Sequence, residues 1–163
     1  MITIDPPSSL TEPSPLSPSG LSRFLNRARA AVGLSGEVDV LLADDATLRR
    51  LNKTFRGKNK ATDVLSFPAA GSDPEMPSHS DQEIAGDLAI SLETAARQAS
   101  AYGHSLRDEV RILLLHGLLH LSGLDHETDT GEMAAREAEL RRQLRLPNTL
   151  IERVTRPRRR RTV

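Results

Sequence analysis

Apolar residues recur along this chain with two different spacings, and these spacings divide it into expected strands and helices. Short runs of alternating or continuous apolar residues predict four strands, at residues 1–4, 38–43, 62–67 and 84–91. Apolar residues three and four positions apart predict five helices, at residues 21–32, 44–57, 93–102, 105–121 and 129–144. Because strands and helices alternate irregularly, the pattern predicts an α+β fold with a small mixed β-sheet packed against helices.

One expected helix differs from the others because it lacks a polar face. Residues 112–121 are apolar almost all round the helix, apart from two histidines and Gly117. Upstream, Ser105 and Asp108 have the spacing of a helix-capping pair, which marks the start of this helix. A helix that is apolar on all sides is buried, so we expect this one at the centre of the fold.

The chain of 163 residues fits a single domain with two flanking segments. We expect an N-terminal strand and a loop rich in proline and serine over residues 1–20, and the folded domain over residues 21–146. Residues 147–163 are rich in arginine and are expected to form a disordered tail that binds polyanions. A polar segment at residues 69–83 is expected to be a mobile lid or a disordered loop.

Composition excludes several classes of protein. The chain has no cysteine, which leaves no disulfide partner, no thiolate zinc ligand and no cysteine nucleophile. Aromatic residues make up 2% of the chain, too few for the base-stacking platform of a single-strand binding module. No apolar run reaches the roughly 18 residues that span a membrane, and the first residues lack the pattern of a secretory signal. We therefore expect a cytoplasmic protein without a membrane partner.

The candidate chemistry lies in the stretch HGLLHLSGLDH, which contains three of the five histidines. His116 and His120 are one helical turn apart and about 40° apart around the helix axis, so both rings can reach one point. Gly123 can adopt a positive φ and reverse the chain, which would bring His126 to the same point. Three neutral imidazoles suit Zn²⁺ with a fourth position left open for catalysis. We therefore predict that His116, His120 and His126 hold one zinc ion per chain.

Two other interpretations of these histidines stay open from the residues alone. They could be packed core histidines, although three at this spacing make that interpretation the less favoured one. They could also form a structural zinc site closed by Asp125, a residue that could otherwise shape the turn or support a ligand. Glu109, on the same helical face, could orient a ligand or form a salt bridge.

The histidine spacing matches the zinc-protease signature H-E-x-x-H-x-x-G-x-x-H, but Gly117 replaces the glutamate. In those proteases the glutamate polarises a water molecule and moves its proton. A glycine can do neither, so peptide hydrolysis lacks its usual base here. Cleavage of a phosphodiester depends instead on positive charge around the phosphate.

Positive charge of this kind is concentrated between residues 49 and 60. The segment has six basic residues and no acidic one, although the net charge of the whole chain is zero. The planar guanidinium of Arg56, at the expected end of a helix, can hold two phosphate oxygens. We expect Arg56 and Lys58 to bind the substrate and Arg56 to act in catalysis. The basic positions before them could equally form a solvated helix face.

Three sequence blocks together resemble a known family. They are LNKTFRGKNKATDVLSFP at residues 51–68, GDLAIS at 86–91 and HGLLHLSGLDH at 116–126, the last followed by Met133 and Glu137. In this order they resemble the YbeY family of bacterial metallo-endoribonucleases, over residues 37–146. The resemblance implies that the three histidines are the zinc ligands and that Arg56 lies near the metal. It also implies cleavage of single-stranded RNA, in 3′-end maturation of small-subunit ribosomal RNA and in ribosome quality control.

The resulting hypothesis is a zinc-dependent endoribonuclease whose partners are ribosomal RNA and a ribosomal subunit or its proteins. Two alternatives stay open, a zinc metalloprotease-like hydrolase and a non-catalytic ribosome-binding factor with a structural metal. The residues do not choose between water and the RNA 2′-hydroxyl as the nucleophile.

Overall fold

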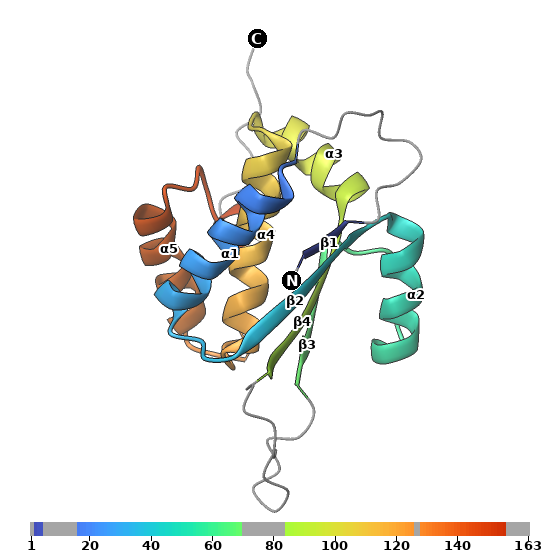
Figure 1. The fold of residues 1–163 in the computed structure, drawn as a ribbon, viewed down its shortest axis with the longest axis horizontal. Helices are drawn as coiled ribbons and strands as arrows, with labels where there is room; N and C mark the ends of the chain where they lie inside the picture. The colour runs from blue at the N-terminus through green and yellow to red at the C-terminus, as the bar shows by residue number, and fades with distance from the viewer. Residues whose placement is uncertain (1, 5–15, 70–83, 126–127, 156–163) are drawn as a thin grey trace, which may run out of the picture.

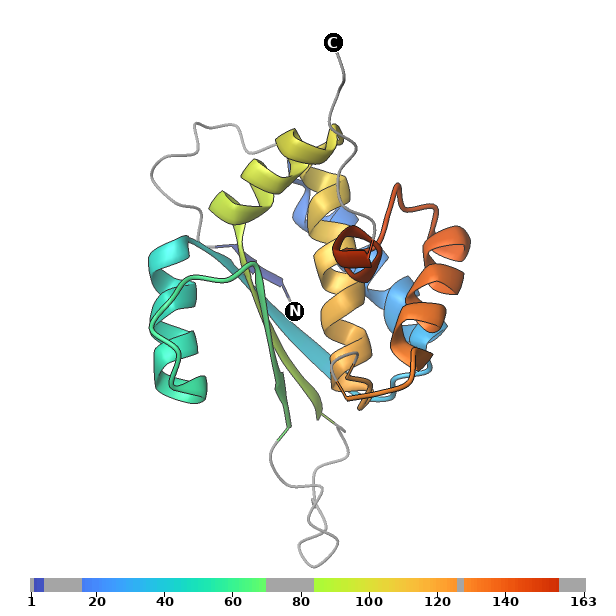
Figure 2. The same cartoon turned by 180° about the vertical axis from the view of Figure 1, so that it is seen from behind.

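The computed structural model describes residues 2–4, 16–69, 84–125 and 128–155, and it shows a β-sheet with helices on both faces (Figure 1, Figure 2). The strands are β1 (Ile2–Ile4), β2 (Glu37–Ala43), β3 (Val64–Pro68) and β4 (Ile84–Ser91). The helices are α1 (Pro18–Val32), α2 (Asp45–Arg56), α3 (Leu92–Tyr102), α4 (Leu106–Leu121), α5 (Glu132–Leu144) and α6 (Leu150–Thr155).

The four strands form one mixed sheet in the order β1-β2-β4-β3. The strands β1, β2 and β4 are parallel, whereas β3 runs antiparallel to β4. The predicted α+β fold with a small mixed sheet is therefore confirmed.

Local signals in the sequence define most helix ends. Ser17 and Ser105 precede α1 and α4, and each hydroxyl accepts a hydrogen bond from a backbone N–H in the first turn. Gly57 ends α2 in the left-handed region, with a φ of 71°. The helix α1 begins three residues earlier than expected because Pro18 occupies its first position, where a proline loses no helical hydrogen bond.

The helix α4 lies at the centre of the fold, as its apolar sequence predicts. Every residue from 112 to 119 is buried. Figure 1 shows α1 in front of α4, and the reverse view in Figure 2 shows α6 in front of it. The main apolar core lies between one face of the sheet and the helices α1, α4 and α5. A smaller cluster lies on the other face, where Leu48 of α2 packs against Leu65 and Ala89.

The structure differs from the sequence prediction after residue 146. Part of the expected disordered tail forms the short helix α6, and both Thr149 and Ile151 are buried. The remainder of that segment, residues 156–163, lies outside the described residues, as does nearly all of the polar segment at 69–83. Within the described ranges, no helix has the length and apolar character needed to cross a membrane.

Candidate active site

Two of the three predicted ligands face each other on the last turns of α4. The Nε2 atoms of His116 and His120 are 3.1 Å apart, and the two rings meet edge to face. His116 is buried, with 6% of its surface exposed, whereas His120 is half-buried at the edge of the helix. The helical spacing therefore brings the two imidazoles together as predicted.

The orientation of His116 is set by Glu137, which lies on α5. The Nδ1 atom of His116 is 2.9 Å from Oε2 of Glu137, and the carboxylate is almost fully buried. The other carboxylate oxygen accepts a hydrogen bond of 3.0 Å from the backbone N–H of Ile151. Burial disfavours the charged carboxylate, but interactions with His116, Ile151 and Thr149 outweigh it and hold the pKa of Glu137 below its usual value.

This arrangement fits a metal ion at the Nε2 atoms. With Nδ1–H of His116 donated to Glu137, the lone pair of Nε2 is directed away from the carboxylate and toward His120. Two imidazole ligands of one tetrahedral zinc ion, each about 2.0–2.1 Å from the metal, have nitrogen atoms roughly 3.3 Å apart. The observed 3.1 Å matches that spacing closely. The third predicted ligand, His126, lies outside the described residues, and no group of three metal-binding side chains occurs within them.

The two histidines open onto a cleft of about 600 Å³, and Arg56 lies on the same cleft. The remaining wall comes from β3 and the segment before it, from the turn after α4, and from α6. These residues are Thr62, Asp63, Val64, Ser66, Pro68, Gly123, Leu124, Asp125 and Leu150. Arg56 is exposed at the end of α2, and its side chain forms no hydrogen bond or ion pair with any described part of the chain. Its guanidinium is therefore free to bind an anion.

The other candidate residues have different surroundings. Lys58 is exposed and is not among the residues that line the histidine cleft. Asp125 lines the cleft, and its backbone carbonyl accepts hydrogen bonds from the N–H groups of Thr128 and Asp129, so it shapes the turn after α4. Gly123, with a φ of 100°, allows the chain reversal that the sequence predicts.

Glu109 forms a salt bridge with Arg153 of α6. Both of its carboxylate oxygens accept hydrogen bonds of 2.6 Å from the guanidinium of Arg153. The ring of His104 lies 2.6 Å from the same carboxylate. The sequence predicts Arg153 in a disordered polyanion-binding tail, but the structure buries its side chain, with 6% exposed. The ion pair between Arg153 and Glu109 therefore connects α6 to α4.

Gly117 has a packing role that the motif comparison did not reveal. A Cβ atom at this position would lie 2.7 Å from Cδ2 of Leu88, on the adjoining strand β4. The position therefore points toward the sheet, and the Oγ of Ser66 donates a hydrogen bond to its carbonyl. A glutamate here would have no room and would not face the cleft.

The sequence points to Glu137 only through the family resemblance, and its contact with His116 is visible only in the structure. A signal was present, because Glu137 belongs to a stripe of buried α5 positions at helical spacing that otherwise holds Met133, Leu140 and Leu144. A carboxylate in such a stripe needs a polar partner. The partner itself is 21 residues away in the sequence, so spacing alone could not identify it.

Comparison with known proteins supports the family assignment. The family described as Endoribonuclease YbeY matches residues 19–145. The chain belongs to the YbeY endoribonuclease family. It is 54% identical to the endoribonuclease YbeY of Koribacter versatilis over 142 residues, which cover 87% of each protein. It is 47% identical to the endoribonuclease YbeY of Solibacter usitatus, over 87% of this chain and 89% of that one.

A solved structure supports the fold of this YbeY chain. The solution structure of TM1509 from Thermotoga maritima superposes with a TM-score of 0.54 and 25% sequence identity. The match covers 88% of this chain and 89% of the Thermotoga protein.

Proposed function

We propose that this protein is a metal-dependent endoribonuclease that cleaves single-stranded RNA in the cleft beside α4. One observation carries the proposal: in a chain of the YbeY family, His116, His120 and Arg56 line the same cleft. A pair of metal-ligating nitrogens and a free guanidinium on one cleft suit a phosphodiester, which carries negative charge and gains more during cleavage.

In the proposed site, His116 and His120 hold one zinc ion together with His126. Bound zinc supplies positive charge at the phosphate and lowers the pKa of water. Glu137 keeps the ring of His116 in the ligating orientation, because its hydrogen bond fixes the proton on Nδ1. Arg56 binds two non-bridging phosphate oxygens through its planar fork and stabilises the charge that develops on them.

The biological role that we propose follows the family resemblance. The substrate is ribosomal RNA near the 3′ end of the small-subunit molecule, and the enzyme acts in the cytoplasm in ribosome maturation and quality control. Its partners there are a ribosomal subunit or its proteins. Lys58 is proposed to bind RNA outside the cleft, because it is exposed two residues beyond Arg56.

Metal analysis and RNA cleavage on the same samples test the proposed site. We expect wild-type protein to contain one zinc ion and to cleave single-stranded RNA, and His116→Ala to lose both properties. We expect Arg56→Ala to keep its zinc and to lose roughly a hundredfold or more in kcat, as when one donor to a developing anion is removed. Arg50→Ala is the matched control, because Arg50 is exposed on the same helix and is absent from the cleft.

Each outcome distinguishes the proposal from its alternatives. Full cleavage by Arg56→Ala would contradict the proposal that Arg56 binds the phosphate. Cleavage of casein but not RNA, lost in His116→Ala, would favour the metalloprotease alternative. Zinc binding without any cleavage would favour a structural metal. The nature of the cut ends identifies the nucleophile, because attack by the RNA 2′-hydroxyl leaves a 2′,3′-cyclic phosphate and attack by water does not.

A further inference from the structure

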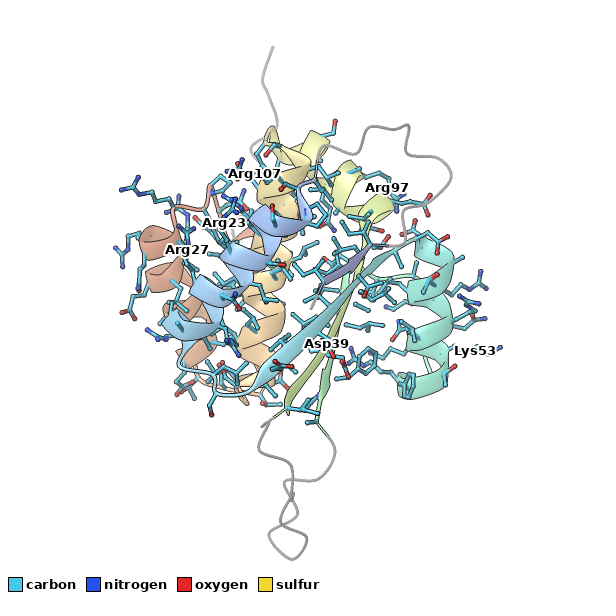
Figure 3. All side chains as sticks on the ribbon, in the orientation of Figure 1. Arg23, Arg27, Asp39, Lys53, Arg97 and Arg107 are labelled. Atoms are coloured by element: carbon cyan, nitrogen blue, oxygen red, sulfur yellow. The ribbon has the colours of Figure 1, made fainter. Side chains whose placement is uncertain are left out.

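A second basic surface lies far from Arg56, where the first turns of α1 and α4 meet. Four arginines surround a groove of about 290 Å³ there: Arg23 and Arg27 from α1, and Arg107 and Arg111 from α4. The members of each pair are four residues apart, so they project from the same side of their helix. We call these four residues the arginine patch. Figure 3 shows Arg107, Arg23 and Arg27 following one another along the outer side of α1.

Two members of the arginine patch pack against an aromatic ring beneath it. Phe24 is buried, with 1% of its surface exposed, and forms part of the main core. The guanidinium carbons of Arg111 and Arg27 lie 5.1 Å and 5.9 Å from the centre of this ring. Cation–π contacts of this kind orient an arginine without neutralising its charge. The two arginines are therefore positioned by the fold while their charge stays available.

No carboxylate within the described chain forms a direct ion pair with the arginine patch. None of the four guanidinium groups forms a hydrogen bond or ion pair with the described segments, and the buried Nε–H of Arg111 has no acceptor among them. Burial, together with the nearby charges of Arg107 and Arg27, lowers the pKa of Arg111, while Asp108 opposes this effect. Four unpaired cations held together cost stability through mutual repulsion, and an anion bound between them would relieve that cost.

The composition of the arginine patch favours phosphate groups in series over a single small anion. All four residues are arginines, whose planar forks match phosphate oxygens, and two of them on each helix repeat along its axis. Phe24 is covered, so no exposed aromatic ring within the patch is available to stack on a base. Such a surface contacts a nucleic-acid backbone without reading its sequence.

We propose that the arginine patch binds the phosphate backbone of RNA at a distance from the segment that enters the cleft. The choice of RNA as the polyanion rests on the proposed function. The patch and the cleft lie on opposite sides of α4, since α1 covers one side and α6 the other (Figure 1, Figure 2). An RNA that contacts both surfaces must pass around the domain. Long RNA therefore uses the patch, whereas a short oligonucleotide that fills only the cleft does not.

Binding of RNA at several salt concentrations tests the arginine patch. The test variant is Arg23→Gln/Arg107→Gln, which removes one exposed arginine from each helix. For a long single-stranded RNA, we expect the slope of log affinity against log salt to become shallower by roughly 1.4, since each lost phosphate contact contributes about 0.7. The control is Arg142→Gln, an exposed arginine on α5 that is absent from the groove. A short RNA should bind wild type and variant with the same slope.

The salt slopes, together with RNA cleavage and vesicle binding by the same proteins, separate this inference from the proposed function. If the slope of log affinity against log salt for long RNA did not change in the double variant, the arginine patch would not bind the RNA backbone. This conclusion would hold whether or not the cleft cleaves short RNA. A shallower slope together with no cleavage of any RNA would retain the patch and reject the proposed catalytic site. Binding of wild type to vesicles that contain phosphatidylserine, lost in the double variant while RNA binding is unchanged, would assign the patch to a lipid surface instead.

Discussion

Glu137 is the residue that connects the candidate metal site to the rest of the fold. One carboxylate oxygen contacts the ring of His116 and the other accepts the N–H of Ile151 at the start of α6. The side chain is 1% exposed, so neither contact can be replaced easily by water. A single buried carboxylate therefore orients a ligand and also holds a helix beside the cleft.

Substitution Glu137→Gln should weaken metal binding. A glutamine keeps the shape, but its one acceptor oxygen can serve only one of the two N–H donors, and it no longer makes the ring of His116 a stronger ligand through a negative charge. Losing such a supporting partner lowers metal affinity by about 10- to 100-fold. Competition with a zinc chelator at constant pH measures the change, and circular dichroism checks the fold.

The matched control for this substitution is Glu139→Gln, on the same helix. Glu139 is exposed and pairs only with Arg136 among its described neighbours, so its loss should leave zinc affinity unchanged. Equal zinc affinity in wild type and Glu137→Gln would show that Glu137 serves the fold alone.

At the residue scale, the sequence predicts the features that depend on local spacing. His116 and His120 converge because one helical turn separates them, and that turn is visible in the sequence. Arg153 illustrates the opposite case, because its partner Glu109 is 44 residues away. Its place in an arginine-rich segment favoured a disordered arm, and only the three-dimensional fold shows a buried ion pair.

At the scale of elements, the contact between α4 and β4 explains why a glycine stands between the two histidines. Helix and strand approach so closely that a Cβ at position 117 would meet the buried side chain of Leu88. The same strand contains Gly86, with a φ of 150°, where a Cβ would lie 2.4 Å from the carbonyl oxygen of Phe67. Two of the three family blocks thus include glycines that the packing requires.

Substitution Gly117→Ala should destabilise the protein, although alanine favours a helix by about 1 kcal/mol. The added methyl group must displace Leu88 in a packed core, and overpacking of this kind costs about 1–3 kcal/mol. In a Leu88→Ala background, which alone costs about 2–5 kcal/mol, the sign should reverse, because the clash is gone and the helix preference is left. Urea unfolding of the four proteins of this cycle measures the effect.

A helical glycine elsewhere in the chain provides the comparison. At Gly20, in the first turn of α1, an added Cβ would meet nothing closer than 3.4 Å. Gly20→Ala should therefore be neutral or stabilising. If Gly117→Ala stabilised the wild-type protein as Gly20→Ala does, the packing explanation would be wrong.

Element prediction succeeds for long amphipathic segments and fails for α6. The helix α6 has six residues, too few for a periodic pattern or for stability on its own. Its position depends on tertiary contacts, above all the hydrogen bond from Ile151 N–H to Glu137. The cleft wall that includes Leu150 was therefore not predictable from the sequence pattern, whereas the strands and helices before it were.

At the scale of the whole molecule, Asp45 connects helix α2 to the end of strand β4 and to helix α3. It is the first residue of α2, and its carboxylate accepts hydrogen bonds from the hydroxyls of Ser91 and Thr94 and from the guanidinium of Arg97. These partners are 46 to 52 residues away, at the end of β4 and in α3. Burial disfavours the charge of Asp45, but these hydrogen bonds outweigh it and lower the pKa of Asp45 below its usual value.

This lowered pKa makes the stability of the fold depend on pH in a defined direction. Because the folded protein holds the proton of Asp45 less tightly than the unfolded chain, the contribution is fully present above the unfolded pKa, about 3.9. It is lost as the pH falls through the lower folded pKa. Asp45→Asn should therefore cost about 1–2 kcal/mol at neutral pH, a range reduced for partial solvent exposure. The difference from wild type should shrink as the pH falls below the unfolded pKa and through the lower folded pKa of Asp45.

Urea unfolding of wild type and Asp45→Asn at neutral and acidic pH measures this difference. Asp87→Asn serves as the control, because Asp87 is an exposed carboxylate on β4, and its loss should change stability by less than about 0.5 kcal/mol at either pH. A gap between wild type and Asp45→Asn that stayed constant on acidification would mean that the charge of Asp45 is not what connects α2 to α3. The contacts would then act through packing alone, and the acid sensitivity of the fold would have to originate in other carboxylates.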